Sequence, residues 1–149
     1  MQKYTLLKLR FQCLCMVDYE FVYAFSKQIL NLHDSIRWVG VANKFGVLVN
    51  VEQRQDLHPL LSEEENEEYA SATVTRQKTR TKFEPKVGKL VYAAARYQKL
   101  NRATIPINDD YYLLISFDIE LKDFDDLIME KILPLVIKEK ASFKDGEQG

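Results

Sequence analysis

The chain has 149 residues and a mass of 17.4 kDa, the size of one domain that can bury a core without a disulfide or a metal. Hydrophobic residues make up 46% and charged residues 29%, which argues against a disordered chain, and five Gly with four Pro exclude collagen-like and low-complexity classes. The 21 Lys and Arg nearly balance the 22 Asp and Glu, so the net charge of −1 argues against a general polyanion binder.

The first fifteen residues allow more than one interpretation. Apolar and polar residues alternate over Leu7–Cys13, which is the pattern of a half-buried strand. Alternatively, translation begins at Met16 and residues 1–15 are an extension outside the native fold. A signal peptide is the less favoured third interpretation, because Lys8 and Arg10 interrupt the apolar stretch and no small-residue cleavage site follows.

The two cysteines of the chain, Cys13 and Cys15, are too few for the disulfide framework of a secreted protein. No apolar run approaches the roughly 18 residues that a membrane span requires. We therefore expect a cytoplasmic protein that does not enter the membrane.

The first half of the domain is predicted to contain two helices around a hairpin. Apolar residues at helical spacing predict a helix over 19–32, with Asp18 as its N-cap. β-Branched and aromatic residues predict strands over 36–42 and 47–52, joined by a turn at 43–46. A capping-box sequence that begins at Ser62 predicts a helix that runs to about residue 83, where Glu84-Pro85 should end it.

The second half is predicted to contain three strands and a final helix. The strands cover 90–100, 102–107 and 111–120. Asp123 should cap the last helix, and Pro134 should kink it.

The predicted order is helix, strand, strand, helix, strand, strand, strand, helix. Short connections favour antiparallel pairing, so the sequence predicts an α+β fold with a five-stranded antiparallel sheet and three helices. The strand at 111–120 should lie centrally beside 36–42, with 90–100 and 47–52 at the edges. We expect one domain over 16–141, preceded by the extension and followed by a flexible polar tail at 142–149.

This element order resembles that of roadblock-type domains in the profilin-like group. Several stretches also resemble a family of small uncharacterised archaeal proteins. The matching stretches are Ile29–Leu32, Ser35–Val41, Leu60–Glu64, Pro85–Lys89, Tyr97–Leu100, Ala103–Pro106 and Lys131–Leu135. The roadblock resemblance implies a dimer that extends its sheet or pairs its middle helices. It also implies a scaffold role, or regulation of a partner such as a small GTPase.

No sequence motif predicts catalysis or a cofactor. Nucleophile elbows, phosphate-binding loops and dinucleotide fingerprints are absent, so we expect no enzyme activity. Cys13, Cys15, His33 and His58 could ligate zinc, but their spacing is not that of a zinc finger, and we expect no metal site.

A group of carboxylates near the end of the last strand has two interpretations. Asp118 and Glu120 share a face of the predicted strand, and Asp123, Asp125 and Asp126 follow closely. They form either a carboxylate pair or cation site, or a solvated strand face followed by a helix cap, and the second interpretation is favoured.

Charge is segregated along the chain. Nine basic residues and one acid lie between Arg76 and Arg102, whereas five acids and no base lie between Glu63 and Glu68. Like charges four residues apart on a helix repel, unless an anion offsets them. The candidates for contact with an anion or a partner are Arg76, Lys78, Arg80, Lys82, Lys86 and Lys89. They form a solvated helix face, or meet the acidic turn of a partner subunit, or bind nucleic acid.

The strand at 90–100 is predicted to be a long apolar edge, which requires a cover. We expect a two-fold homodimer through this edge, with Val91, Ala93, Ala95 and Tyr97 at the contact. The middle helices would pack antiparallel, so that acids of one copy (Glu63, Glu64, Glu67 and Glu68) approach bases of the other (Arg76, Arg80 and Lys82). In the competing arrangement, the Leu7–Cys13 strand covers this edge and leaves a monomer.

The sequence therefore predicts a non-enzymatic protein-interaction or signalling-scaffold domain. Two alternatives stay open. One is a small-molecule sensor with Trp38 and Tyr92 in its pocket, although both residues also suit core packing. The other is a binder of anions or nucleic acid through 76–102, with an affinity that falls steeply with salt.

Overall fold

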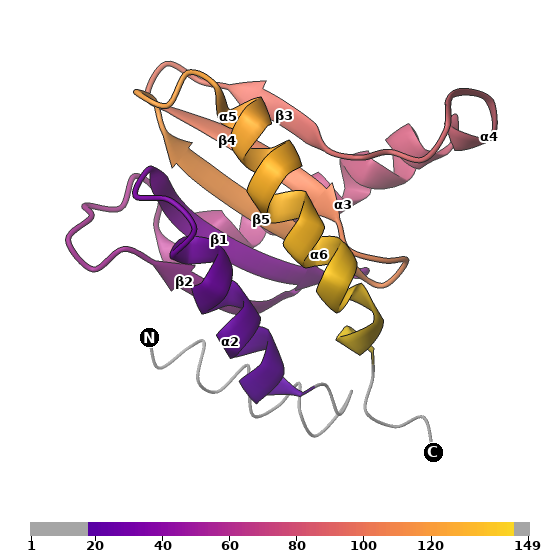
Figure 1. Cartoon of the computed structure of the whole chain (residues 1–149), viewed down its shortest axis with the longest axis horizontal. Helices are drawn as coiled ribbons and strands as arrows, with labels where there is room; N and C mark the ends of the chain where they lie inside the picture. The colour runs from indigo at the N-terminus through magenta and orange to yellow at the C-terminus, as the bar shows by residue number, and fades with distance from the viewer. Residues whose placement is uncertain (1–17, 145–149) are drawn as a thin grey trace.

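The computed structural model describes residues 18–144, in which five strands form one antiparallel sheet in the order β2-β1-β5-β4-β3 (Figure 1). The strands are β1 (Ile36–Asn43), β2 (Leu48–Gln53), β3 (Ala93–Arg96), β4 (Leu100–Pro106) and β5 (Tyr111–Asp118). The predicted fold class is confirmed, and so are the central position of the last strand and the two edge positions. The Leu7–Cys13 strand lies outside the described residues.

Helices cover both faces of the sheet (Figure 1). On one face lie α2 (Tyr19–Leu30) and a C-terminal helical run of α5 (Phe124–Leu127), η1 (Ile128–Ile132) and α6 (Leu133–Glu139), followed by the short η2 (Lys140–Ser142). On the other face lies α3 (Glu63–Thr81). The short helix α4 (Glu84–Val87) projects beyond the sheet.

The larger core lies beneath α2 and the C-terminal helices. Asp18 caps α2 by accepting a hydrogen bond from the backbone N–H of Phe21 at 3.1 Å, as predicted. Val22, Phe25 and Ile29 of this helix are buried against sheet residues on β1, β4 and β5. The core therefore follows the helical and strand periodicities of the sequence.

The smaller core lies beneath α3. Ser62 and Glu65 form the predicted capping box, with hydrogen bonds of 3.1 and 2.9 Å. The helix contributes few apolar side chains to this core. Its buried apolar members are Ala70 and Val74. Trp38 fills the space between α3 and the sheet, and its ring crosses Gly40 so closely that a Cβ there would lie 2.4 Å from a ring carbon.

Two local predictions need correction around residues 84–100. Glu84-Pro85 does not simply end the helix, because α4 begins there with Pro in its first turn, where a missing N–H costs nothing. The predicted strand 90–100 is only the four residues of β3. Before β3, the Glu84 carboxylate accepts a hydrogen bond from the Leu90 N–H at 2.8 Å. After it, residues 97–99 form the turn, and Leu100 already belongs to β4.

The end of the chain also differs from the sequence prediction. β5 ends at Asp118, so Glu120 lies in a turn. One π-type turn precedes Pro134, in which the Leu133 N–H bonds the carbonyl of Ile128 five residues back. The wider turn adapts the helix to a proline that lacks an N–H.

Phe143 lies within the segment that was expected to fray, yet it is 2% exposed and belongs to the larger core. Its ring packs on those of Phe21, Phe25 and Tyr111, with centroid separations of 5.0, 4.8 and 5.7 Å. Asn108 holds this segment by donating a hydrogen bond to the Phe143 carbonyl at 2.7 Å.

Candidate interaction surface

The edge strand β3 carries unused backbone hydrogen-bonding groups. It pairs with β4 on one side and, within residues 18–144, with no strand on the other. The Tyr97 N–H bonds the Leu100 carbonyl at 2.8 Å, which fixes Tyr97 and Leu100 as a hydrogen-bonded pair. Because such pairs alternate along an antiparallel ladder, the N–H groups of Ala94 and Arg96 point away from β4 toward the open edge.

The register also shows which side chains of this strand face α3. Ala93 and Ala95 lie opposite Thr104 and Arg102, which are on the α3 side, because the intervening Ala103 belongs to the larger core. Alternation places Ala94 on the other face. Ala93 and Ala95, two of the predicted contact residues, therefore face the α3 side.

Four large apolar side chains between the end of α3 and the end of β3 are exposed, by 57% for Phe83, 80% for Val87, 45% for Val91 and 54% for Tyr97. Phe83 and Val87 lie beside or on α4, which projects from the sheet in Figure 1, whereas Val91 and Tyr97 flank the edge strand β3. Exposed apolar side chains beside an open strand edge suit contact with a partner.

The six basic candidates from Arg76 to Lys89 are all exposed. Within the described part of the chain they form one ion pair, between Lys89 and Glu84 at 3.9 Å. Arg76 and Arg80 instead donate hydrogen bonds to Thr73 and Gln77 of the same helix, at 3.0 and 2.7 Å. The segregated charge is thus present on the folded surface, with the acids at the start of α3 and the bases toward its end.

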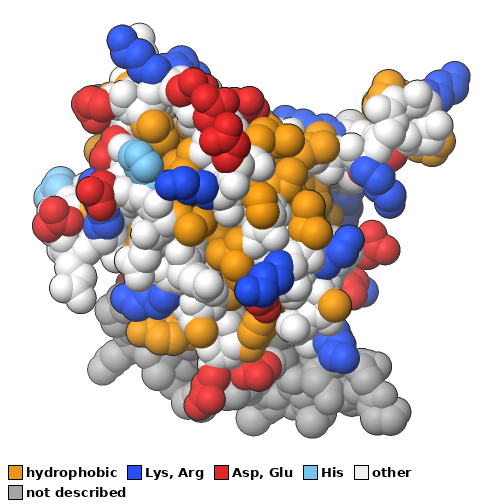
Figure 2. Space-filling view, in the orientation of Figure 1, with side chains coloured by type: hydrophobic (Ala, Val, Ile, Leu, Met, Phe, Trp, Pro, Cys, Tyr) orange, Lys and Arg blue, Asp and Glu red, His pale blue; other side chains and the backbone are white. Residues whose placement is uncertain are grey.

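The face drawn in Figure 2 offers a different surface. Apolar side chains gather over the C-terminal helices there, and acidic side chains cluster above them. Met129 and Ile137 are 42% and 58% exposed on these helices. Among the described residues, helices cover this face, so it offers side-chain contacts rather than strand pairing.

The two predicted pocket residues do not meet. Trp38 belongs to the smaller core beneath α3, whereas Tyr92 packs against the larger core on the opposite face. The Tyr92 hydroxyl donates a hydrogen bond to the Asp125 carboxylate. The prediction of a shared pocket is therefore wrong, because Trp38 and Tyr92 project from opposite faces of the sheet.

The hydrogen bond to Asp125, with smaller contributions from burial and from the charge of Asp125, raises the pKa of Tyr92 from 10.0 to about 12. The folded protein thus favours the neutral phenol, and this contribution to stability is complete below pH 10 and lost between pH 10 and 12.

We expect Asp125→Asn to lower the Tyr92 pKa toward 10, as measured by tyrosinate absorbance against a Tyr92→Phe reference. Tyr112, whose pKa burial raises, is the internal control that should not move. Superimposable titrations of wild type and Asp125→Asn would contradict this assignment.

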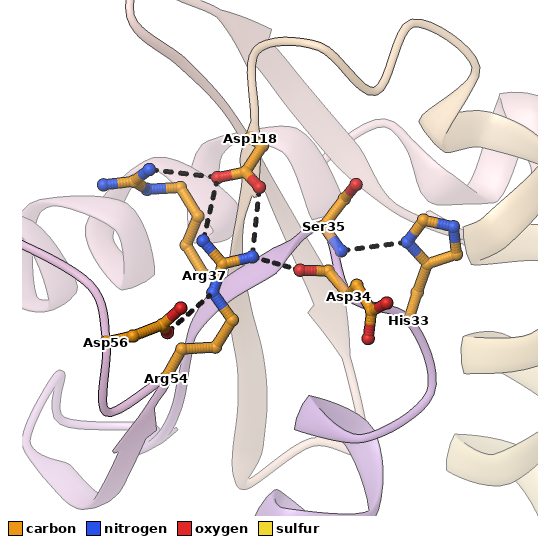
Figure 3. Close-up of polar contacts among 7 residues, drawn as sticks. All are labelled: His33, Asp34, Ser35, Arg37, Arg54, Asp56 and Asp118. Atoms are coloured by element: carbon orange, nitrogen blue, oxygen red, sulfur yellow. Dashed lines mark hydrogen bonds and ion pairs between the residues drawn. The ribbon is translucent and has the colours of Figure 1, made fainter.

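At Asp118, the carboxylates near β5 form neither the pair of the less favoured interpretation nor the solvated face of the favoured one. Asp118 is bound by two arginines, with Arg37 Nη1 and Arg54 Nη1 each 3.0 Å from a carboxylate oxygen (Figure 3). Arg54 also donates to the Asp34 carbonyl and lies 3.9 Å from Asp56. The ion pairs and the early end of β5 explain why Asp118 and Glu120 do not act together.

Asp123 occupies the N-cap position of α5 without a capping hydrogen bond. A hydrogen bond with Asp123, and then the negative charge of Asp123, raise the pKa of Asp126. Residues 18–144 contain no group of three or more His, Cys, Asp or Glu side chains that could hold a metal. His33 accepts a hydrogen bond from the Ser35 N–H through Nδ1, and Cys13 and Cys15 lie outside the described residues.

Sequence reasoning did not single out Arg37 or Arg54, and it included Arg102 only as the last base of the segment 76–102. Arg37 and Arg54 lie 81 and 64 positions from Asp118, so no local pattern reveals their contacts. Arg102 alternates with Ala103 and would be taken as a solvent-facing strand residue, yet it is 6% exposed.

The fold is that of known solved structures. The gliding protein MglB of Thermus thermophilus superposes with a TM-score of 0.65 over 83% of this chain and 90% of that one, at 10% identity. A roadblock/LC7 domain from Streptomyces avermitilis superposes with a TM-score of 0.62 over 79% and 93%, at 7% identity. The chain has the roadblock/LC7 fold. Myxococcus xanthus MglB gives a TM-score of 0.61 over 80% and 97%, at 14% identity.

At the level of sequence, no protein-family model matches the chain, and no curated protein is significantly similar to it. The described part of the chain contains no helix with the length and apolar character of a transmembrane segment.

Proposed function

We propose that the chain is a non-enzymatic interaction domain of roadblock type, which forms a cytoplasmic homodimer and serves as a signalling scaffold. The observation that carries the proposal is the open β3 edge, with the outward N–H groups of Ala94 and Arg96 beside exposed apolar side chains. An edge of this kind is a template for pairing with another strand. By analogy of fold, the scaffold's partner would be a protein such as a small GTPase.

The edge geometry supports a two-fold arrangement. Two copies of β3 that pair antiparallel would join two five-stranded sheets into one, and each strand would supply the donors and acceptors that the other requires. Four residues give few hydrogen bonds. A stable dimer therefore also needs side-chain contacts, which the exposed Val91 and Tyr97 can supply.

The charge pattern of α3 supports the same arrangement. The helix has 19 residues and is about 28 Å long at 1.5 Å per residue, so its acidic start cannot reach its own basic end. In an antiparallel pair of these helices, the exposed Glu64 and Glu68 of one copy lie near Arg76 and Arg80 of the other. The pairing would offset the repulsion between like charges within each helix.

The structural neighbours are consistent with assembly through this fold, since one MglB structure is described in a tetrameric arrangement, with a TM-score of 0.62 over 82% of this chain. The resemblance to small archaeal proteins adds no activity to the proposal. The experiment below separates edge pairing from other modes of association.

We expect the wild-type chain to have twice its monomer mass of 17.4 kDa in sedimentation equilibrium, and Ala94→Pro to be monomeric. Proline removes the outward N–H of Ala94 and leaves the hydrogen bonds to β4 in place. The matched control is Ala94→Thr, which keeps the N–H and should remain dimeric. The same measurement on a chain that starts at Met16 tests whether residues 1–15 affect the edge.

A charge exchange tests the helix contact separately. Arg76→Glu with Arg80→Glu should weaken the dimer, and adding Glu64→Lys with Glu68→Lys should restore it.

An Ala94→Pro chain that stays dimeric would overturn edge pairing. Failure of the charge exchange to restore the dimer would remove the antiparallel α3 contact. Nucleic-acid binding that is lost in the Arg76 and Arg80 variant would support the polyanion alternative instead.

A further inference from the structure

Arg102 is a buried cation that has no anionic partner within residues 18–144. It is 6% exposed, and its guanidinium carbon lies 3.7 Å from the centroid of the Tyr69 ring on α3. Its Nη1 is buried and has no hydrogen-bond partner in the described part of the chain. Within residues 18–144 no carboxylate pairs with it. The two other arginines of this part of the sheet, Arg37 and Arg54, both share Asp118.

A buried arginine of this kind destabilises the fold unless an anion or a hydrogen-bond acceptor compensates its lost hydration. A buried charge loses its hydration, and proteins normally restore the loss with an ion pair and hydrogen bonds. Stacking on Tyr69 compensates in part, because the ring face attracts a cation. The ring supplies no acceptor for Nη1, so the site still lacks an oxygen at the guanidinium.

Arg102 lines an open groove of about 560 Å³. Its walls are mainly apolar and come from four places: the loop before α3, the side of α3, the turn between β3 and β4, and β4 itself. The residues are Leu60, Leu61, Tyr69, Tyr97, Leu100 and Arg102, with Gln98 and Lys99 at the turn. The volume lies within the range of sites for small organic ligands.

A second buried donor lies near the groove. Arg102 and three groove leucines, Leu60, Leu61 and Leu100, also border a small cavity of about 20 Å³, and Trp38 lines that cavity. The Trp38 Nε1–H is buried and, like Arg102 Nη1, has no acceptor within residues 18–144. Two buried donors beside the groove thus lack an acceptor oxygen.

We propose that this groove binds a small organic acid, with the carboxylate at Arg102 and an apolar body against Leu60, Leu61 and Tyr97. A planar carboxylate matches a guanidinium with two parallel hydrogen bonds. A phosphate ester suits the groove less well, because Lys99 is the one other cation in its lining and is exposed. The proposal goes beyond the scaffold function, and the groove shares Tyr97 with the proposed dimer contact.

The test uses 4-phenylbutyrate as the probe and 4-phenylbutyramide as its uncharged match, each titrated into the ¹⁵N-labelled full chain and followed by NMR. We expect the acid to shift amide signals of Tyr97–Arg102 and of Leu60 and Leu61. The amide should bind at least about tenfold more weakly, because a charged hydrogen bond is lost. Arg102→Met, which fills a similar volume without a charge, should lose the preference for the acid.

Two further variants keep the proposal falsifiable if Arg102→Met does not fold. Tyr97→Ala changes an exposed side chain and should weaken the acid and the amide equally. Lys138→Ala, an exposed position on α6 that lies on the other face of the sheet and does not line the groove, should change neither. Equal affinity for acid and amide in the wild type would overturn the assignment. A dimer that dissociates in Arg102→Met would also overturn it, since the guanidinium would then serve the contact between copies.

Discussion

Replacement of Phe143 by alanine is expected to lower the free energy of unfolding by about 3–5 kcal/mol, the range for a truncated core phenylalanine. The ring is 2% exposed and contacts three other aromatic rings. The variant loses the transfer free energy of the ring and leaves a cavity between α2 and β5. Two contacts, with Phe21 and Phe25, are edge-on, an orientation that aromatic pairs favour.

The measurement is equilibrium unfolding in urea, with Phe45→Ala as the matched control. Phe45 is 73% exposed in the turn between β1 and β2, so its removal should change the free energy of unfolding by no more than about 0.5 kcal/mol. A loss below about 1 kcal/mol for Phe143→Ala would show that the segment after η2 is not part of the cooperative core.

Much of the fold could be predicted because periodicity and capping are local. Asp18 and Ser62 marked the starts of α2 and α3, and both make the capping hydrogen bonds that the sequence suggested. The order of the sheet followed from short connections and from the strongly apolar 111–120 segment. These features need only residues close together in the chain.

Other features could not be predicted because they depend on long-range contacts. β3 is short because the Leu90 N–H bonds Glu84 before it and residues 97–99 turn into β4 after it, and an apolar run reveals neither contact. Phe143 stands alone in a polar tail, and only the tertiary structure shows its three ring partners. The stacking of Arg102 on Tyr69 joins β4 to α3, so a sequence pattern cannot distinguish it from a solvated arginine.

Asp118→Ala is expected to lower the free energy of unfolding by about 2–3 kcal/mol. Removing one partner of a buried ion pair costs about 3–5 kcal/mol, and partial exposure reduces this value. The side chains of Asp118, Arg37 and Arg54 are 20%, 14% and 26% exposed, so the two cations would remain largely desolvated without their anion. The loss should be measured by urea unfolding at neutral pH.

The matched control is Asp110→Ala, which breaks the exposed ion pair with Lys44 and should cost no more than about 1 kcal/mol. Equal losses in Asp118→Ala and Asp110→Ala would show that burial of the arginines does not matter.

Asp118 also acts at a distance, because Arg54 begins the loop that carries Leu60 and Leu61 to the groove. Loosening of that loop in Asp118→Ala should weaken binding of 4-phenylbutyrate while Arg102 remains in place, which separates the shape of the groove from its charge.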